Sequence, residues 1–203
     1  LENGFEDIMQ VEAAVLKSIF ERLQRECAPE LALLGVTAPS IDKIITVTFA
    51  EAHQIVLDQT GRDCRGEKDL DPEEERVVCD YAKKTWGTDF VFVTHYPSVK
   101  RPFYALDDPA NPDTTLSFDL LFRGIEITTG GARMFRYEDY LRKMKARDMN
   151  PQLFESYLQA FRYGMPPHGG LGLGLERLVA QICGLANVKE ASLFPRDRKR
   201  LEP

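Results

Sequence analysis

The stretch HGGLGLGLERLV, residues 168–179, places four glycines directly ahead of an acid and an arginine. Glycine lets a backbone approach a ligand closely. Glu176 and Arg177 would stand in the first turn of the helix that follows, where an arginine faces the positive end of the helix dipole. That placement costs roughly a few tenths of a kcal/mol unless an anion offsets it. Arg177 is therefore a candidate ligand for a phosphate group.

Two familiar glycine-rich phosphate sites do not fit this stretch. The dinucleotide fingerprint needs a strand that leads into the glycines, but the residues before Gly170 read YGMPPH, which a central strand would not tolerate. A Walker loop ends in Gly-Lys-Ser or Gly-Lys-Thr, and neither follows here. The remaining alternative is structural, because glycines also permit close strand packing or a positive φ before a helix.

A second group of residues that could do chemistry lies on a predicted β-hairpin in SFDLLFRGIEITTGGAR. If Arg123 and Gly124 form a two-residue turn, Asp119 pairs with Thr128, and Glu126 is a diagonal neighbour on the same face. The two acids would then lie roughly 7 to 8 Å apart at their backbones, within reach of one divalent cation. Such oxygen ligands suit Mg²⁺ bound together with substrate phosphates. The plain alternative is a solvated sheet face.

The same alternation places Arg133 on the opposite face of the sheet from these acids. For Arg133 to join them, the Gly130-Gly131 pair must form a β-bulge that shifts the strand by one residue. A shared site for the three charges therefore depends on an irregularity in this strand.

The histidines and cysteines offer fewer candidates. His168 adjoins the glycines and is a candidate site residue, because imidazole donates and accepts near neutral pH. We expect His53 to lie on the surface or in the core, and His95 receives no role. Three scattered histidines without ligand spacing argue against a zinc enzyme. The four cysteines contain no C-x-x-C pair and are expected to be reduced thiols.

The composition of the 203 residues, with 43% hydrophobic and 29% charged residues, is that of an ordinary globular chain. No window approaches the roughly 18 to 20 apolar residues that cross a bilayer, and no signal peptide is recognisable, so we predict a cytoplasmic protein without membrane contact. The net charge of −6 argues against wholesale polyanion binding. Because the chain begins at Leu1 inside a helical pattern, we expect it to be a piece of something longer.

Periodicity and capping residues predict the elements that position these candidates. Helices are expected over residues 3–28, 49–61, 72–87, 137–148, 151–164 and 175–184. Strands are expected over residues 44–48, 89–97 and 101–106, with two more within 114–131. The predicted fold class is α+β, a mostly antiparallel sheet with helices packed on it.

Three stretches together carry a resemblance to a known family. They read RPFYALDDPANPDTTLSFDLLFRGIEITTGGAR, FRYGMPPHGGLGLGLERLV and ASLFPRDRKRLEP. The chain resembles the C-terminal portion of the catalytic domain of class II aminoacyl-tRNA synthetases, and within that class the aspartyl-tRNA synthetases of the archaeal type. The order of the expected elements follows the family from Leu1 to Pro203. The resemblance therefore implies a class II synthetase-like fold, with residues 1–203 as one part of the catalytic domain and the third signature motif at residues 168–184.

The resemblance also implies roles for the candidate residues. Arg177 matches the arginine that holds the terminal phosphate of ATP, and it is the implied catalytic residue. The glycines would let the strand lie close under adenine and ribose, and the acids Asp119 and Glu126 match those that position Mg²⁺ and ATP. The implied ATP-binding residues are Asp119, Glu126, Gly172, Gly174 and Arg177, and the implied substrate-binding residues are Arg133, His168 and Gly170.

Arg133 matches the arginine that pairs with the side-chain carboxylate of the aspartate substrate, a task suited to a planar guanidinium. The family usually continues QRIH at this point, whereas this chain reads Ala132-Arg133-Met134-Phe135, so the histidine two places on is missing. The sequence FPRD, residues 194–197, favours the aspartyl branch over the asparaginyl branch.

The function implied is that of an aspartate–tRNA ligase, which activates L-aspartate with ATP and transfers it from aspartyl-adenylate to tRNA. The first two family motifs and the anticodon-binding domain are expected upstream of Leu1, so this chain alone would hold a partial active site. The full-length form is expected to be a homodimer. Three alternatives stay open: an asparaginyl-tRNA synthetase, a synthetase-derived asparagine synthetase, and a non-catalytic synthetase-like module.

Overall fold

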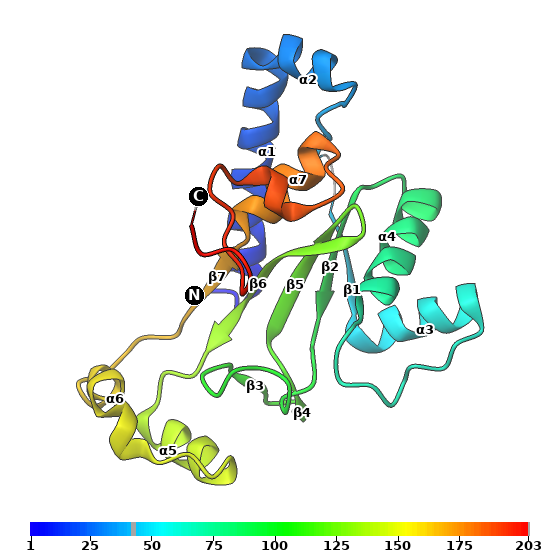
Figure 1. The fold of residues 1–203 in the computed structure, drawn as a ribbon. Helices are drawn as coiled ribbons and strands as arrows, with labels where there is room; N and C mark the ends of the chain where they lie inside the picture. Colours follow the sequence, from blue (N-terminus) through cyan, green and yellow to red (C-terminus); the bar gives the residue numbers. More distant parts are fainter. Residues whose placement is uncertain (42–43, 203) are drawn as a thin grey trace.

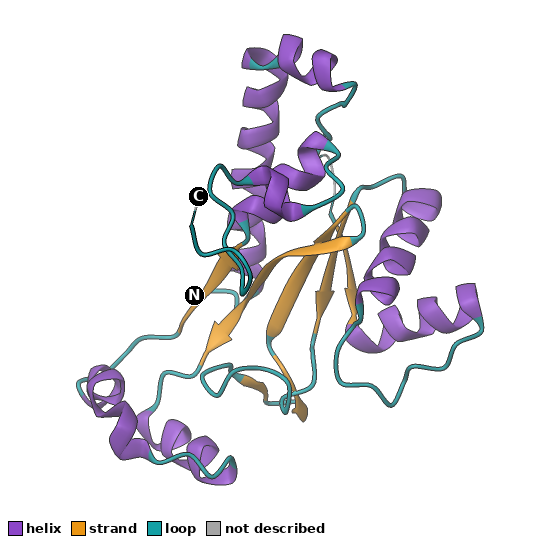
Figure 2. Ribbon diagram, viewed as in Figure 1, coloured by secondary structure: helices purple, strands orange, loops and turns teal. Residues whose placement is uncertain are grey.

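The computed structural model describes residues 1–41 and 44–202, so Pro203, the last residue of the third resembling stretch, lies outside the described residues. Its main feature is a five-stranded sheet with the order β1-β2-β5-β6-β7 and helices on both faces (Figures 1 and 2). The first two strands of this order run parallel and the other neighbours are antiparallel. The predicted α+β class with a mostly antiparallel sheet is confirmed. The strands are β1 (Ile45–Thr48), β2 (Phe90–Thr94), β5 (Ser117–Phe122), β6 (Ile125–Arg133) and β7 (His168–Leu173).

The helices mostly begin and end where their capping residues predict. Asp71 accepts hydrogen bonds from the backbone N–H groups of Glu73 and Glu74 at the start of α4, and Gly87 ends that helix in the left-handed conformation. No described helix is long and apolar enough to cross a membrane. The helices are α1 (Glu6–Glu26), α2 (Ala28–Leu34), α3 (Phe49–Thr60), α4 (Pro72–Trp86), α5 (Tyr137–Ala146), α6 (Glu155–Arg162) and α7 (Leu175–Cys183), with 3₁₀ turns η1 (Pro151–Phe154) and η2 (Val188–Ala191).

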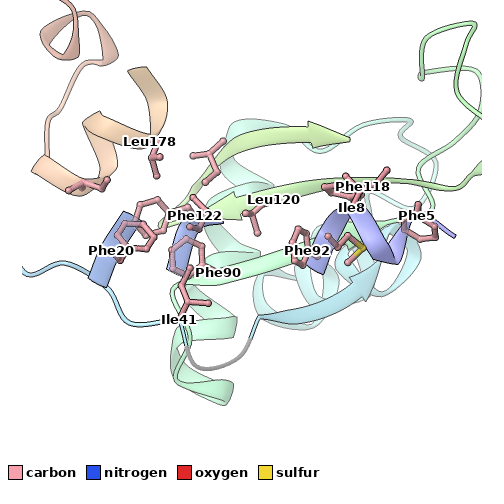
Figure 3. Packing of buried hydrophobic residues seen from close by; sticks show 14 of the residues in the cluster. Phe5, Ile8, Phe20, Ile41, Phe90, Phe92, Phe118, Leu120, Phe122 and Leu178 are labelled. Carbon is pink, nitrogen blue, oxygen red and sulfur yellow. The ribbon is translucent and has the colours of Figure 1, made fainter. Parts of the chain in front are cut away.

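Alternate residues of the central strands feed two separate cores. The aromatic rings of Phe90 and Phe122 stack at a centroid distance of 4.4 Å on the face covered by α1 and α7 (Figure 3). On the other face, Val91, Val93 and Leu121 pack against α3 and α4. Each fully buried side chain of this kind stabilises the fold by about 1.5 to 3 kcal/mol. Strands β2 and β5 are therefore packed against helices on both faces of the sheet.

The second face is covered unevenly. The helices α3 and α4 pack over β1, β2 and β5, whereas a cavity lies against the same face of β6 and β7. A third cluster, which includes Met134, Tyr140 and Phe161, joins α5 and α6 beyond the end of β6. The sheet therefore has a packed half and an accessible half on one face.

Helix α1 carries an acid into the first core. Glu12 is 3% exposed, and neither of its carboxylate oxygens has a hydrogen-bond partner in the described part of the chain. Burial raises the pKa of Glu12 to about 7, opposed by the hydroxyl of Thr128 and reinforced by Asp119. The carboxyl group of Glu12 is therefore mostly protonated and neutral below about pH 7.

The element predictions are wrong in two regions of the chain. No strand covers residues 101–106, because Lys100 and Ala105 donate backbone hydrogen bonds to Pro97 and Pro102 in consecutive turns, and a single bridge joins Ala105 to Arg133. The residues that follow form the hairpin of β3 (Asp107–Asp108) and β4 (Asn111–Thr115), which was not predicted. The first helix ends at Glu26 rather than at residue 28, and Pro29 lies in the first turn of α2, where its missing N–H costs nothing.

We predict that a methyl group at Gly169 destabilises the sheet. A Cβ at this position would lie 2.5 Å from the Gly131 carbonyl oxygen and would also meet the Ile8 side chain, so backbone must move. Gly169→Ala should lower the free energy of unfolding by about 1 to 3 kcal/mol. Gly172→Ala on the same strand is the matched control, because its Cβ would meet nothing within 4 Å, and its effect should stay within about 0.5 kcal/mol. Urea unfolding followed by circular dichroism measures both, and equal midpoints for the two variants would contradict the packing described.

Candidate active site

A β-bulge in β6 sets which residues share a face. The register pairs Leu121 with Glu126 but Leu120 with Thr128, so Ile127 is an extra residue without a partner on β5. The Ile127 carbonyl instead accepts a hydrogen bond from the N–H of Gly174, at 2.7 Å. The bulge is therefore tied to the residue that precedes α7.

The bulge overturns part of the predicted pairing. Asp119 pairs with Thr129 and not with Thr128, which turns toward α1. Beyond the bulge, Thr129, Gly131 and Arg133 alternate onto the face that carries Asp119 and Glu126. The expectation that Arg133 lies opposite the acids is therefore wrong. The one-residue shift that brings Arg133 to the face of the acids does exist, but it lies at Ile127 rather than at Gly130-Gly131.

Strand β7 brings three more predicted residues to this face. Its register pairs Gly172 with Thr129, Gly170 with Gly131, and His168 with Arg133. A cavity of about 270 Å³ lies on the face. Its lining includes Arg101, Tyr104, Thr129, Arg133, Gly170 and Gly172.

The glycines keep this cavity open. A Cβ at Gly172 would meet nothing within 4 Å, so the strand presents bare backbone to the open space. A Cβ at Gly170 would lie 3.3 Å from the guanidinium of Arg133, which is tighter than an ordinary contact. The Arg133 guanidinium lies 5.0 Å from the centre of the Tyr104 ring. Among the described residues, no carboxylate lies within ion-pair distance of it.

Asp119 is held by an arginine that the sequence did not single out. The Arg101 guanidinium lies 2.8 Å from Asp119 Oδ2, and the two side chains are 9% and 4% exposed. Arg101 also stacks on the Tyr96 ring, 3.9 Å from its centroid. The other carboxylate oxygen, Asp119 Oδ1, has no hydrogen-bond partner in the described part of the molecule. One acceptor of this acid therefore remains available for a donor or a cation.

Glu126 lies at the centre of a group of polar contacts. Arg177 Nη1 donates to its backbone carbonyl at 2.8 Å and approaches its carboxylate at 3.3 Å. The Thr129 hydroxyl donates to the same carboxylate at 3.1 Å. The backbone N–H of Glu126 donates to the carboxylate of Glu75 on α4, at 3.0 Å. The first-turn arginine of α7 thus has an anionic neighbour, and its side chain stays 45% exposed toward solvent.

Negative charge accumulates at this end of the site. Burial raises the pKa of Glu75 to about 7; the hydrogen bond from the Glu126 N–H and the charge of Arg177 oppose the shift, while the carboxylates of Glu126 and Asp119 reinforce it. Burial and the nearby Asp119 also raise the pKa of Glu126. These acids interact closely enough to disfavour one another's ionisation, so an added cation would be stabilised between them. Carboxylate and hydroxyl oxygens are the ligands that Mg²⁺ prefers.

The sequence did not indicate Arg101, Glu75 or Thr129 as site residues. Arg101 fell in the segment wrongly predicted as a strand, and Glu75 stands on a helix 51 residues away from its partner. Thr129 was hidden because the predicted register placed it on the other face. The alternation of β6 would have revealed Thr129 had the bulge been recognised.

His168 is placed differently from the other predicted residues. Its ring stacks against Phe161, with 6.1 Å between centroids, and its Nδ1 lies 3.1 Å from the carbonyl oxygen of Pro166. It stands opposite Arg133 in the sheet but does not line the cavity. Neither histidine nor cysteine is among the described residues that line it. The guanidiniums of Arg101 and Arg133 in its lining equip the cavity to bind and orient anionic groups.

Comparison with protein families and curated proteins gives a consistent result. A family model described as tRNA synthetases class II (D, K and N) matches residues 3–198. An aspartate–tRNA(Asp/Asn) ligase of Thermus thermophilus is 47% identical over 208 residues, which cover 100% of this chain and 48% of the relative. An aspartate–tRNA(Asp) ligase of Pyrococcus furiosus is 45% identical over 157 residues, 77% of this chain and 36% of the relative. The chain spans about half the length, or less, of these relatives.

Solved structures resemble the whole chain. An aspartyl-tRNA synthetase from Entamoeba histolytica matches with a TM-score of 0.90 and 27% identity, covering 98% of this chain and 41% of that one. An asparaginyl-tRNA synthetase from Pyrococcus horikoshii, complexed with asparaginyl-adenylate, matches with a TM-score of 0.87 and 31% identity, covering 97% and 45%. The arrangement of sheet and helices described above is therefore shared with both.

We predict that ionisation of Glu75 weakens the fold as the pH rises. Its pKa is raised from 4.5 to about 7, so the stability contributed by the neutral carboxyl is present below pH 4.5 and is lost as the pH rises through 7. Glu75→Gln keeps an oxygen acceptor for the Glu126 N–H and removes the ionisation. The loss of unfolding free energy between pH 5 and pH 8 should therefore be smaller in this variant by roughly 1 kcal/mol.

The measurement is urea unfolding at both pH values without added Mg²⁺. Glu73→Gln, an exposed change on the same helix, is the control and should leave the pH dependence as it is. Glu12→Gln removes the other carboxyl whose pKa is raised to about 7, which separates the two contributions. Parallel pH profiles for the wild type and Glu75→Gln would show that this acid ionises freely in the folded state.

Proposed function

The chain belongs to the class II tRNA synthetases (D, K and N), and on this premise we propose that it is the C-terminal part of the catalytic domain of an aspartate–tRNA ligase. Its α+β fold is the class II synthetase-like fold that the sequence predicted. In the proposed reaction, L-aspartate and ATP give aspartyl-adenylate and pyrophosphate. The aspartyl group then moves to the terminal ribose of tRNA, and AMP is released.

The main support for this proposal is the arrangement of charged side chains around the glycine strand. Two acids, Asp119 and Glu126, share a sheet face with Arg133 above a strand of glycines, and Arg177 contacts Glu126 from the start of α7. Bare backbone offers a flat surface to a planar base and ribose, while the flanking guanidiniums offer positive charge to phosphate and carboxylate groups. A nucleotide and a small dicarboxylic amino acid require this combination.

The residues present fit ATP and Mg²⁺. Gly172 and Gly174 would lie under the nucleotide, since a Cβ at Gly172 would meet only open space. Arg177 would face the terminal phosphate. Asp119 and Glu126 would hold Mg²⁺, to which Asp119 offers an oxygen without a partner. When bound, Mg²⁺ supplies positive charge that offsets the phosphates.

Arg133 would bind the side-chain carboxylate of aspartate. Its guanidinium lines the cavity and faces no carboxylate of the described chain, so a substrate carboxylate would complete a charge-assisted pair. An asparagine amide offers no negative charge to it, which favours the aspartyl over the asparaginyl reading. Gly170 leaves the room that this side chain occupies. A substrate contact of His168 and the homodimer implied by the resemblance stay predictions.

The site works by orientation and charge. Arg133 and Arg177 would hold opposite ends of the reacting pair, so that the α-carboxylate oxygen of aspartate faces the α-phosphorus of ATP. That oxygen forms the new bond to phosphorus as the bond to pyrophosphate breaks, and the released negative charge stays near Arg177. No proton transfer and no protein nucleophile are needed in this step.

We predict that Arg177→Ala in the full-length protein lowers aspartate-dependent ATP–pyrophosphate exchange by roughly 100-fold or more, because a preorganised positive charge at the leaving phosphates is lost. Arg25→Ala is the control, since Arg25 is an exposed residue of α1 whose side chain pairs only with Glu26 among the described residues. Near-normal exchange in a folded Arg177→Ala protein would overturn the phosphate role.

We predict that Arg133→Gln raises the KM for aspartate by about 100-fold and leaves the KM for ATP within about 3-fold, because only the amino acid loses a charge-assisted partner. The exchange assay with each substrate varied in turn measures both. Equal loss for the two substrates would make Arg133 a structural residue.

The same preparations separate the alternatives. Free asparagine formed from aspartate, ATP and ammonia without tRNA would identify a synthetase-derived asparagine synthetase. Exchange driven by asparagine rather than aspartate would identify the asparaginyl branch. A folded full-length protein that catalyses no exchange with either amino acid would be a non-catalytic module.

A further inference from the structure

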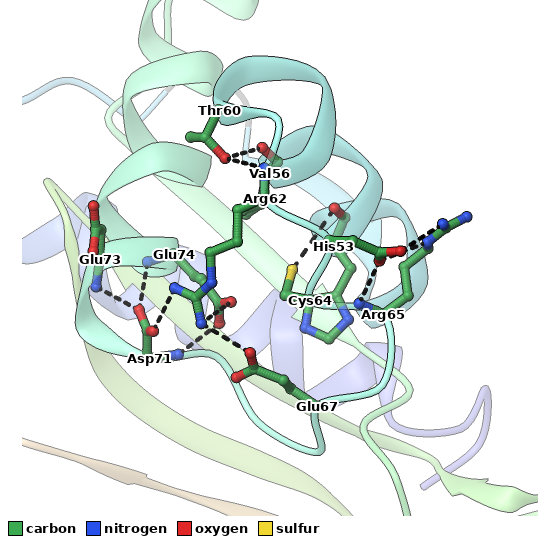
Figure 4. Close-up of polar contacts among 11 residues, drawn as sticks. His53, Val56, Thr60, Arg62, Cys64, Arg65, Glu67, Asp71, Glu73 and Glu74 are labelled. Carbon is green, nitrogen blue, oxygen red and sulfur yellow. Dashed lines mark hydrogen bonds and ion pairs between the residues drawn. The ribbon is translucent and has the colours of Figure 1, made fainter.

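A second cluster of metal-ligating side chains lies outside the cavity, between α3, α4 and the loop of residues 61–71 (Figure 4). His53 comes from α3, Cys64 from the loop and Glu74 from α4. Their donor atoms all lie within 4.8 Å of one another, although the residues are far apart in sequence. They are 2%, 0% and 1% exposed. The fold has therefore brought three different ligand types together inside a core.

The nitrogen donor of this cluster has no partner among the described residues. His53 Nε2 makes no hydrogen bond within the described part of the chain, whereas Glu74 Oε1 makes none but lies 3.3 Å from the guanidinium of Arg62. The thiol of Cys64 makes a weak contact with the backbone oxygen of His53, at 4.0 Å, and also faces the carboxylate of Glu74. A buried polar atom without a partner costs about 1 to 3 kcal/mol. An unpartnered buried nitrogen close to a thiol and a carboxylate indicates a group that accepts its electron pair.

A neighbouring acidic group has a different explanation. Glu67, Asp71 and Glu74 also lie within 4.8 Å of one another, but the guanidinium of Arg62 stands among them. It lies 2.8 Å from Glu67, 2.8 Å from Asp71 and 3.3 Å from Glu74 Oε1 (Figure 4). A protein cation therefore already pairs closely with Glu67 and Asp71, and it contacts Glu74 at a longer distance. Arg62 makes no hydrogen bond to the unpartnered nitrogen of His53 in the described part of the chain, so this nitrogen remains available to the first cluster.

We propose that His53, Cys64 and Glu74 form a Zn²⁺ site. Imidazole nitrogen, thiolate sulfur and carboxylate oxygen are together characteristic of zinc, whereas Mg²⁺ and Ca²⁺ select oxygen alone. The thiolate and the carboxylate would neutralise the two charges of the ion, as a buried site requires. Three protein ligands leave a fourth position for water.

Binding of Zn²⁺ would require the three ligand side chains to move slightly closer together. Ligand atoms around a tetrahedral zinc lie about 3 to 4 Å apart, so donors at up to 4.8 Å must close by about 1 Å. Glu74 Oε2 is already fixed by the Asp71 N–H at 2.8 Å, so Oε1, which lies 3.3 Å from Arg62, is the oxygen that would turn to the metal. The ion would tie the loop of residues 61–71 to both helices. Its role would be structural, because the cluster does not line the proposed catalytic cavity.

The test is a Co²⁺ titration of the metal-free, reduced full-length protein. We expect a thiolate-to-cobalt charge-transfer band that saturates at about one equivalent and is displaced by Zn²⁺. Cys64→Ser should abolish the band. Cys79→Ser is the matched control, a buried thiol of the same core that belongs to no ligand cluster among the described residues, and it should keep the band. Zn²⁺ should raise the thermal unfolding midpoint of the wild type but not of Cys64→Ser.

His53→Gln and Glu74→Gln keep every thiol and should each weaken Zn²⁺ binding by at least about 10-fold. Glu74→Gln retains an oxygen for the Asp71 N–H, so it tests the ligand without removing the helix cap. Absence of the band in the wild type overturns the site. A band that survives Cys64→Ser, or undiminished binding in a folded His53→Gln protein, does the same. Failure here leaves the ATP–pyrophosphate exchange predictions standing, since they concern other residues.

Discussion

The one extra residue in β6 is the constraint on which the candidate active site depends. With uninterrupted alternation, Arg133 would turn into the core beneath α1, and Asp119 would stand beside Thr128. The bulge at Ile127 moves the second half of the strand by one residue, so that acids and arginine meet on one face. The same carbonyl receives the N–H of Gly174, which brings the start of α7 to Glu126. A single backbone irregularity thus positions side chains from three elements.

The charges gathered there are only partly balanced within the chain. Arg101 is buried with Asp119, whereas Arg177 is half exposed beside Glu126. A third acid, Glu75, is the group most clearly shifted toward its neutral form. Mutual repulsion of carboxylates is a cost that the fold carries and that a bound cation would relieve. The buried pair of Arg101 and Asp119 therefore shapes the site. The accessible pair of Arg177 and Glu126 is the one that can contact a ligand.

The sequence predicts what depends on local signals and misses what depends on tertiary contacts. The caps of α4 and the turn at Arg123 and Gly124 are local, and the structure has both. The bulge has no such signal, because Ile127 is a β-branched residue that suits a regular strand. The bulge is accompanied instead by the hydrogen bond from the N–H of Gly174, 47 residues later in the chain, to the Ile127 carbonyl. The residue types therefore predict which acids and arginines belong to the site. They do not predict the face of the sheet on which these side chains lie together.

Helix α4 links the two sites described for this chain. Successive residues of a helix point about 100° apart, so the adjacent acids Glu74 and Glu75 serve different neighbours. Glu74 turns to His53 and Cys64, while Glu75 accepts the N–H of Glu126 at the bulge. Both carboxylates belong to one rigid helix. A displacement of α4 that alters the contacts of Glu74 with His53 and Cys64 must therefore also alter the contact of Glu75 with Glu126. The packing of the loop of residues 61–71 against α4 therefore bears on the geometry around Glu126, although the loop contributes no residue to the cavity lining.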